Sequence, residues 1–143
     1  IADARGFVAA LALGAEGIQM GTRFLATTEG TLHDNYKRAL LDAGDRDTTV
    51  TGRTTGLQFR VLKNQLAERV LQMEREGKDR HEIDAFTIGS LRKAAVQGDV
   101  EWGSLMMGQV SGMIRDIRSV KELLDEIMAG AEKEIERLRR FVL

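Results

Sequence analysis

The first twenty residues carry two successive patterns of apolar positions. Phe7 and Leu11 recur at the spacing of one helix face, among alanines that favour helix. Asp3 is placed to cap the start of this helix, and Gly14 is placed to end it. The run 17–20 is short, largely apolar and β-branched at its centre, which is typical of a buried parallel strand. A helix followed at once by such a strand predicts the second half of a βαβ unit.

The strand predicted over residues 17–20 has no partner earlier in the chain. A strand of a parallel sheet lies beside other strands of that sheet, and here only a helix precedes it. The chain also opens on Ile1 rather than on methionine. We therefore expect a portion of a larger α/β domain. The alternative is a small domain that begins with a helix.

The middle of the chain predicts several further elements, separated by polar or glycine-containing breaks. Amphipathic helices are expected over residues 33–43, 61–76 and 83–96, where large apolar residues recur every three or four positions. Residues 48–51 are rich in threonine and valine and predict a strand. Residues 57–61 fit either a second short strand or the entry to the following helix.

The last third of the chain predicts a long helix. Ser119 and Glu122 match a capping box, followed by apolar positions at helical spacing. The stripe expected to be buried consists of Leu123, Leu124, Ile127 and Met128. Residues 132–140 are highly charged and predict a solvated end of the same helix.

Composition narrows the class of protein. The 143 residues include no proline and no cysteine, and 30% are charged, with a net charge of −1. Without proline the chain is expected to be predominantly helical, and without cysteine it has no disulfide, thiolate metal site or cysteine nucleophile. A nearly neutral chain is not typical of nucleic-acid binders. No apolar run is long enough to span a membrane and no signal peptide is recognisable, so a soluble, cytoplasmic protein is expected.

The first candidate for ligand binding is the run Gln19, Met20, Gly21 and Thr22. A strand that runs into Gly-Thr and then into a helix is typical of a phosphate-binding loop. Glycine lets backbone N–H groups approach an anion closely, and a helix N-terminus favours negative charge. Thr22 adds a hydroxyl and can cap the next helix. The alternative is an ordinary turn.

The second candidate is the stretch 103–112, in which methionines stand among several glycines and serines. Met106, Met107 and Met113 are adaptable side chains that suit the wall of a flat, apolar ligand pocket. Gln109 offers a neutral amide that can reach a ring heteroatom. The alternative, favoured on chemistry alone, is a close-packed helix with methionine filling gaps.

The two histidines do not predict a metal site. His33 and His81 are far apart in the sequence, and neither has a second ligand at helical spacing. His33 is interpreted as a capping or surface residue rather than a catalytic base. The chain contains no P-loop, no GxGxxG and no Ser-His-Asp order, so no complete catalytic apparatus is visible.

Several stretches of the chain nevertheless occur in the same order in a known flavoprotein superfamily. They are residues 1–6, 9–15, 19–24, 33–37, 47–50, 60–65, 98–100 and 103–112. Together they resemble the C-terminal part of the nitronate monooxygenase / 2-nitropropane dioxygenase superfamily. Within it the chain is most similar to the flavin-dependent enoyl-acyl-carrier-protein reductase II branch. The resemblance fades after about Met128, and Asp34 stands where the family often has proline.

The resemblance implies an α/β fold, the C-terminal part of an FMN-binding TIM barrel. Such a barrel has roughly 250 residues in all. Residues 1–27 would supply barrel helix 7, strand 8 and the phosphate loop. Residues 28–99 would form a helical cap insert, and residues 100–143 barrel helix 8 with a helical tail.

The resemblance also implies a cofactor and the residues that bind it. Gln19, Met20, Gly21 and Thr22 match the family's FMN-contacting segment. A second set matches a segment that lines the flavin and substrate pocket. It consists of Met106, Gly108 and Gln109. The family's catalytic histidine lies upstream of this sequence, so no catalytic residue is expected here and the chain alone is expected to be inactive.

The activity implied is that of an NAD(P)H-dependent oxidoreductase of fatty acid synthesis. The intact enzyme would pass hydride from NADH or NADPH through FMN to an enoyl thioester of acyl-carrier protein or coenzyme A. A homodimer would be compatible with this function. One alternative keeps FMN but oxidises alkyl nitronates with oxygen. Another is a non-catalytic helical interaction module that assembles through residues 123–128.

Overall fold

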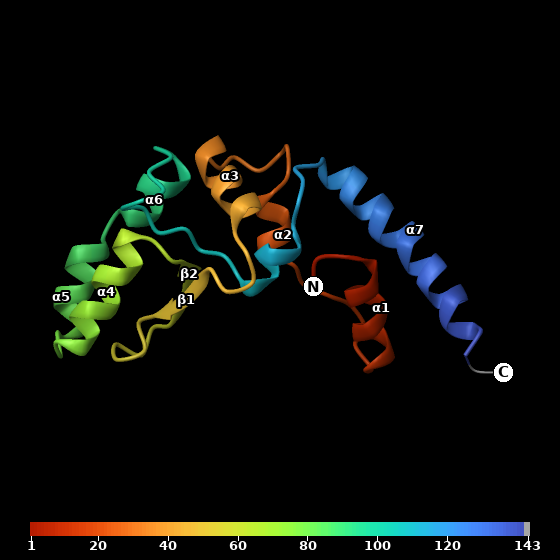
Figure 1. Ribbon diagram of the computed structural model, residues 1–143, viewed down its shortest axis with the longest axis horizontal. Helices are drawn as coiled ribbons and strands as arrows, with labels where there is room; N and C mark the ends of the chain where they lie inside the picture. The colour runs from red at the N-terminus through yellow and green to blue at the C-terminus, as the bar shows by residue number, and fades with distance from the viewer. Residues whose placement is uncertain (142–143) are drawn as a thin grey trace. The chain divides into compact units, whose positions relative to one another are not determined.

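The computed structural model describes residues 1–141 (Figure 1), and the chain divides into two compact units. Unit 1 contains Ile1–Gly30 and the segment from Asp116 onward, and unit 2 is Thr31–Arg115. The helices of unit 1 are α1 (Ala4–Ala12), α2 (Thr22–Leu25) and α7 (Val120–Arg139). The elements of unit 2 are α3 (Asp34–Asp42), β1 (Thr48–Thr51), β2 (Phe59–Leu62), α4 (Gln65–Arg75), α5 (Arg80–Thr87), α6 (Ser90–Ala95) and the 3-10 helix η1 (Gln109–Met113).

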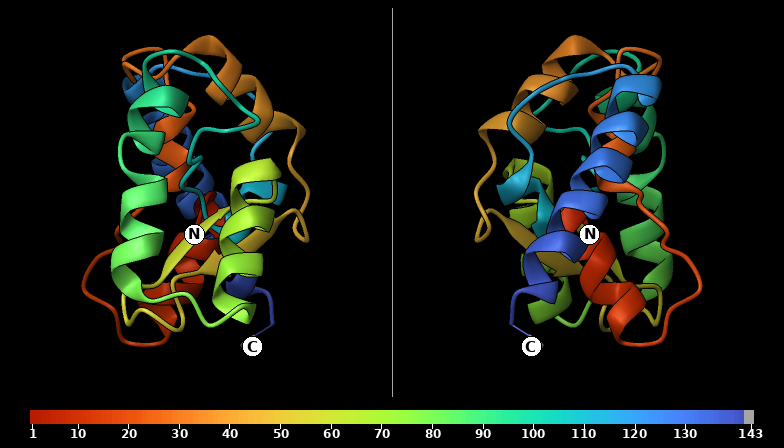
Figure 2. Two further views of the ribbon diagram at one scale, coloured as in Figure 1. Left: turned by 90° about the vertical axis from the view of Figure 1, so that its left-hand side faces the viewer. Right: turned by 90° about the vertical axis from the view of Figure 1, so that its right-hand side faces the viewer.

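Unit 1 is built on the packing of α1 against α7 (Figures 1 and 2). Asp3 caps α1 as expected, since its carboxylate accepts a hydrogen bond from the Gly6 amide at 2.9 Å. The capping box expected at Ser119 and Glu122 is also present at the start of α7. Gly130 lies where the helices are closest, because a Cβ there would be 2.6 Å from the Cβ of Ala4.

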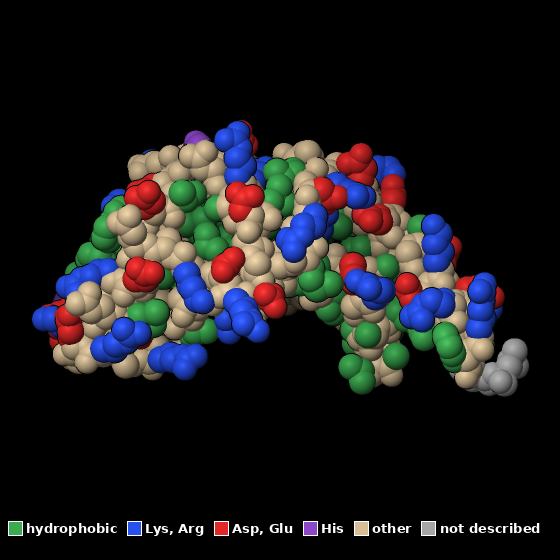
Figure 3. Space-filling model, viewed as in Figure 1, with side chains coloured by type: hydrophobic (Ala, Val, Ile, Leu, Met, Phe, Trp, Pro, Cys, Tyr) green, Lys and Arg blue, Asp and Glu red, His purple; other side chains and the backbone are tan. Residues whose placement is uncertain are grey.

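The stripe predicted on α7 is only half correct. Leu123 and Ile127 are buried, together with Ala131, but Leu124 and Met128 are 45% and 55% exposed. The nine-residue α1 covers one narrow face of a twenty-residue helix, so the neighbouring face stays open. Apolar side chains are also exposed at the far end of α1 (Figure 3).

The strand predicted over residues 17–20 is wrong for this structure, in which the segment has no regular secondary structure. A parallel strand is defined by its hydrogen bonds to a neighbouring strand. Within residues 1–141, no segment pairs with residues 17–20. The segment therefore lies at the surface, with Gly17 and Gln19 exposed.

Unit 2 is built on a β-hairpin and the helices that follow it. The expected strand 48–51 is β1, and residues 59–62 form β2, which pairs antiparallel with β1 from Thr48 opposite Leu62 to Thr51 opposite Phe59. The helix expected from residue 61 starts later, at Gln65, because β2 uses residues up to Leu62. The Asn64 side chain then caps α4 by accepting from the Ala67 amide at 3.0 Å.

One buried apolar cluster of unit 2 lies where α4 meets α5. It consists of Leu66, Val70, Met73 and Ile83. The single helix predicted over residues 83–96 is instead two helices, α5 and α6. Gly89, with φ of +78°, separates them by turning the chain through a left-handed conformation that ends one helix and starts the next.

Helices dominate the secondary structure, as the composition predicted. The expected helix 33–43 is α3. No helix between residues 1 and 141 is both long enough and apolar enough to cross a bilayer.

Candidate functional site

The two stretches predicted to bind a ligand lie in different units of the structure. Residues 19–22 belong to unit 1, and residues 106–109 belong to unit 2.

Gly21 and Thr22 lie where the irregular segment enters α2. Gly21 is the N-cap of α2 and Thr22 its first residue, so Thr22 does not cap this four-residue helix as expected. A Cβ built on Gly21 would meet no protein atom within 4 Å. The space in front of the Gly21 backbone is therefore open and can receive an external group.

Arg23, the next residue, anchors this segment to unit 1. Its side chain is 6% exposed, and its Nη2 lies 2.7 Å from Oδ1 of Asp116. Its Nη1 donates to the Asp116 carbonyl oxygen at 3.1 Å and to the Ala26 carbonyl oxygen at 3.4 Å. The role of this residue was not predicted from the sequence. Its partner is 93 positions away, and no local pattern marks the pair.

The segment that follows α2 and the segment that precedes α7 run side by side in unit 1. The Thr28 amide donates to the Arg118 carbonyl oxygen at 2.9 Å. The Val120 amide donates to the Glu29 carboxylate at 2.9 Å, and this hydrogen bond holds the pKa of Glu29 below its ordinary value. Together with Arg23 and Asp116, these contacts fix residues 23–29 against residues 116–120.

In unit 2, residues 105–107 lie along the open edge of β2. The Leu62 amide donates to the Leu105 carbonyl oxygen at 2.9 Å, and the Met107 amide donates to the Arg60 carbonyl oxygen at 3.2 Å. Met106 therefore faces Val61 in an antiparallel bridge. The helix considered for residues 103–112 is wrong for residues 103–108, which are not helical; only η1 is.

Tyr36 fixes the backbone of Met106 from the other side. Its hydroxyl donates to the Met106 carbonyl oxygen at 2.7 Å, and its side chain is 2% exposed. Burial raises the pKa of Tyr36 to about 12, because the phenolate would lose its hydration. Sequence reasoning missed this contact as well, since 70 positions separate the two residues.

The remaining residues of the second stretch have mixed surroundings. Met107 is buried and Met106 is half-buried, whereas Met113 and Gln109 are exposed. Gln109 begins η1, directly after Gly108. The stretch thus offers one fixed methionine and one accessible amide.

The histidine interpretation is confirmed for His33. Its Nδ1 accepts from the Asn35 amide at 3.1 Å, which makes it the N-cap of α3. His81 is exposed on α5. Among the residues that the structure describes, no three His, Asp or Glu side chains are grouped closely enough to hold a metal ion.

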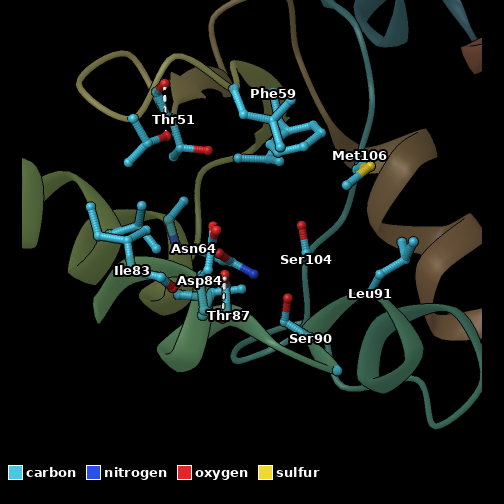
Figure 4. Close-up of a pocket in the computed structure, with 18 residues that line it drawn as sticks. Thr51, Phe59, Asn64, Ile83, Asp84, Thr87, Ser90, Leu91, Ser104 and Met106 are labelled. Atoms are coloured by element: carbon cyan, nitrogen blue, oxygen red, sulfur yellow. Dashed lines mark hydrogen bonds between the residues drawn. The ribbon is translucent and has the colours of Figure 1, made fainter. Parts of the chain in front are cut away.

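A cavity of about 200 Å³ lies inside unit 2 (Figure 4). The hairpin, α4, α5, the start of α6 and residues 104–106 form its walls. Of the residues predicted to form a site, only Met106 lines it. Its other walls come from four separate elements, and no sequence motif marks such a convergence.

The sequence model of nitronate monooxygenase matches residues 1–130. The chain belongs to the nitronate monooxygenase family. The match confirms the superfamily to which the sequence was compared.

Among solved structures, FabK from Thermotoga maritima matches the nitronate monooxygenase-family chain with a TM-score of 0.93 and 43% identity. The match covers 99% of this chain and 45% of FabK. It confirms the α/β class and the correspondence to the C-terminal part of a TIM-barrel enzyme.

Two curated relatives illustrate the range of activities among similar proteins. A nitronate monooxygenase of Paraburkholderia phytofirmans is 32% identical over 99% of this chain and 38% of its own length. A (3aS,4S,5R,7aS)-5-hydroxy-7a-methyl-1-oxo-octahydro-1H-indene-4-carboxyl-CoA dehydrogenase of Mycobacterium tuberculosis is 35% identical over 90% of this chain and 47% of its own length. The chain thus spans less than half the length of these relatives.

Proposed function

We propose that this chain works as the C-terminal part of an intact FMN-dependent oxidoreductase, most similar in activity to enoyl-acyl-carrier-protein reductase II. The observation that carries the proposal is the match to FabK, at a TM-score of 0.93 over 99% of the chain. In this proposal unit 1 contributes barrel elements and unit 2 the cap, close to the division into residues 1–27, 28–99 and 100–143.

The FMN-binding role is assigned to Gln19, Met20, Gly21 and Thr22. The open space in front of Gly21 supports it, because a phosphate group can approach the backbone there without meeting a side chain. The buried Arg23 supports it as well, since it holds the adjoining backbone in place. When bound, FMN would supply the hydride-transfer chemistry, with NADH or NADPH as the donor.

The substrate-facing role is assigned to Met106, Gly108 and Gln109. The half-buried Met106 has a backbone fixed by β2 and by Tyr36, so it can serve as a rigid apolar wall. The exposed Gln109 can donate and accept hydrogen bonds through its amide. The catalytic residue is assigned to a part of the intact enzyme outside this chain, so the chain alone is proposed to be inactive.

An enoyl thioester of acyl-carrier protein or coenzyme A is the favoured substrate. Structural similarity to FabK exceeds that to a nitroalkane oxidase from Streptomyces ansochromogenes, which has a TM-score of 0.75 and 30% identity. The second candidate, oxidation of alkyl nitronates, is favoured by the family that matches residues 1–130. A cytoplasmic homodimer is the form in which we propose that the enzyme acts.

The two activities are separated by one pair of assays on the intact enzyme. The proposal expects NADH or NADPH oxidation that depends on crotonyl-CoA and proceeds without oxygen. The alternative expects oxygen consumption that depends on propyl-2-nitronate and needs no nicotinamide. Oxygen consumption alone would overturn the enoyl reductase proposal and leave the flavin proposal standing.

The FMN assignment is tested separately with Gly21→Val. A valine side chain would fill the open space and displace the anion, and each hydrogen bond lost to a charged group is worth roughly 1.5–3 kcal/mol. Flavin affinity should fall by at least about tenfold. Thr22→Ala should have a smaller effect, because the backbone N–H remains. Fluorescence titration with FMN measures both, with circular dichroism to verify folding; an unchanged affinity in folded Gly21→Val would show that this loop is only a turn.

A further inference from the structure

The cavity of unit 2 has an apolar end and a hydroxyl-bearing end. The apolar end is formed by buried side chains of α4 and α5. They are Leu66, Val70 and Ile83. The other end is formed by Ser90, Ser104 and Met106, and Figure 4 shows both serine hydroxyls pointing into the cavity.

A backbone hydrogen bond places the two serines next to each other. The Ser104 amide donates to the Ser90 carbonyl oxygen at 3.0 Å, which joins the segment before Met106 to the first turn of α6. Ser90 is buried and Ser104 half-buried, and no hydrogen bond joins either hydroxyl to another residue drawn around the cavity (Figure 4). Two hydroxyls that face a cavity can donate to an acceptor oxygen of a ligand.

The charge of the lining excludes an anionic ligand from this cavity. Asp84 is the single ionisable residue among those that line it, and its carboxylate pairs with Arg80 at 3.2 Å. Among the residues that the structure describes, no Lys, Arg or His lines the cavity. Asn64 is occupied too, because its Nδ2 donates to the carbonyl oxygens of Val100 and Gly103. The lining of the cavity therefore suits a ligand group that is neutral and largely apolar.

The size of the cavity fits part of a ligand rather than a whole one. Sites for complete small molecules usually measure about 300–1,000 Å³, and this cavity measures about 200 Å³. That volume equals about seven water molecules at roughly 30 Å³ each, and a methylene group occupies a similar space. A short hydrocarbon chain fills it.

We propose that this cavity binds the hydrocarbon tail of an acyl thioester, with Ser90 and Ser104 donating hydrogen bonds to an oxygen near the head of the tail. Met106 connects the cavity to the substrate, because it both lines the cavity and belongs to the stretch assigned to the substrate. The inference rests on the proposed function for the class of substrate. It adds the subsite that selects the length of the acyl chain.

The test compares the binding of two saturated thioesters to the intact enzyme. Butanoyl and octanoyl N-acetylcysteamine cannot be reduced, so calorimetry reports binding without turnover. The octanoyl thioester has four more methylenes than the butanoyl thioester. Their complete burial would raise the affinity roughly two hundredfold, and incomplete burial would still raise it about tenfold. We expect octanoyl to bind at least about tenfold more tightly. Equal affinity of the two thioesters would overturn the subsite, whichever reaction the enzyme catalyses.

Three variants locate the preference in the cavity. Ser104→Leu fills the cavity, and should reduce the octanoyl preference to about twofold or less. Ser90→Ala combined with Ser104→Ala leaves the cavity open, and should weaken both thioesters severalfold while keeping their ratio. Gln97→Leu adds the same side chain at an exposed position outside the cavity. It should change neither the affinity for the butanoyl thioester nor the affinity for the octanoyl thioester.

Each outcome for the variants decides part of the proposal. A folded Ser104→Leu enzyme with the full octanoyl preference would place the tail elsewhere. Unchanged binding in the double alanine variant would remove the serines from the subsite. Because the double variant removes only two hydroxyls, it keeps the proposal testable if Ser104→Leu fails to fold. Failure of the proposed function would show instead as absent crotonyl-CoA reduction.

Discussion

Residues 19–22 and residues 106–109, the two stretches to which ligand contacts are assigned, differ in how their own units hold them. Met106 is hydrogen-bonded through its carbonyl oxygen to Tyr36, and its neighbours pair with β2. In contrast, residues 17–21 donate no backbone hydrogen bond within the described structure. Beyond them, Arg23 ties the chain to Asp116 through a buried ion pair.

The difference follows from where the partners of each stretch are encoded. All partners of residues 105–107 lie in unit 2, so this wall is preorganised before any ligand arrives. A parallel strand over residues 17–20 needs another strand beside it, and the described residues of this chain offer none. Preorganisation of residues 17–21 therefore depends on the residues that follow them, among them Arg23, and on pairing with a further segment.

Hydrogen exchange should give the largest contrast between the two stretches. In the 143-residue chain, the amides of Leu62 and Met107 should exchange at least about a thousandfold more slowly than those of residues 17–21, because only the former are hydrogen-bonded in a packed unit. Exchange followed by mass spectrometry measures this. Equal protection of both stretches would show that residues 17–21 are paired after all, and protection of neither would show that unit 2 does not fold in this chain.

Tyr36→Phe tests the support of the Met106 wall. It removes the hydroxyl and leaves a buried carbonyl oxygen without its donor, which should lower the free energy of unfolding by about 1–3 kcal/mol. Urea unfolding of the intact enzyme measures the loss. If Tyr36→Phe unfolds at the wild-type urea concentration, β2 alone holds Met106.

The same residue predicts a dependence of stability on alkaline pH. The pKa of Tyr36 is about 12 in the folded protein and near 10 when unfolded, so between these values only the folded state keeps the proton. The free energy of unfolding should therefore fall as pH rises from about 10 to about 12, by at most about 1.4 kcal/mol per pH unit. Tyr36 is the only tyrosine among the 143 residues, so in this chain taken alone tyrosinate absorbance reports its titration directly. Tyr36→Phe should lack this contribution.

Local signals in the sequence were sufficient for the starts of several helices. Asp3, His33 and Ser119 each cap a helix through an amide two or three residues away, so their roles are readable from short spacings. The break between α5 and α6 at Gly89 could not be predicted in this way, because glycine within an apolar helical pattern is often tolerated.

The contacts that hold the two stretches could not be predicted from local patterns in the sequence. Arg23 and Asp116 are 93 positions apart, and Tyr36 and Met106 are 70 apart. Either pair forms only after the fold brings distant segments together. The serines of the cavity are likewise joined by tertiary structure rather than by a motif.

Arg23→Met tests the anchor of the other stretch. Removing one member of a fully buried ion pair costs about 3–5 kcal/mol, but here Asp116 is 41% exposed and also pairs with Arg118, so its carboxylate stays hydrated. We expect a loss of about 1–2 kcal/mol in urea unfolding and weaker FMN binding. Arg118→Met is the matched control. Arg118 is 40% exposed, so its replacement should lower the free energy of unfolding by under about 1 kcal/mol. Equal losses in the two variants would mean that burial of Arg23 adds nothing.

Ser111→Ala should have the smallest effect and the opposite sign. Ser111 lies in η1, close in sequence to residues 106–109. Its hydroxyl is fully buried without a hydrogen-bond partner among the described residues. An unsatisfied hydroxyl destabilises the folded state, so its removal should raise the free energy of unfolding by up to about 1 kcal/mol, offset in part by lost packing. Ser119→Ala is the informative contrast, because the hydroxyl of Ser119 caps α7 and its loss should destabilise by about 1 kcal/mol. Thermal unfolding of both variants measures the two changes in stability, which should have opposite signs. A clear loss of stability in Ser111→Ala would reveal a partner for this hydroxyl, and with it another contact that holds residues 106–109.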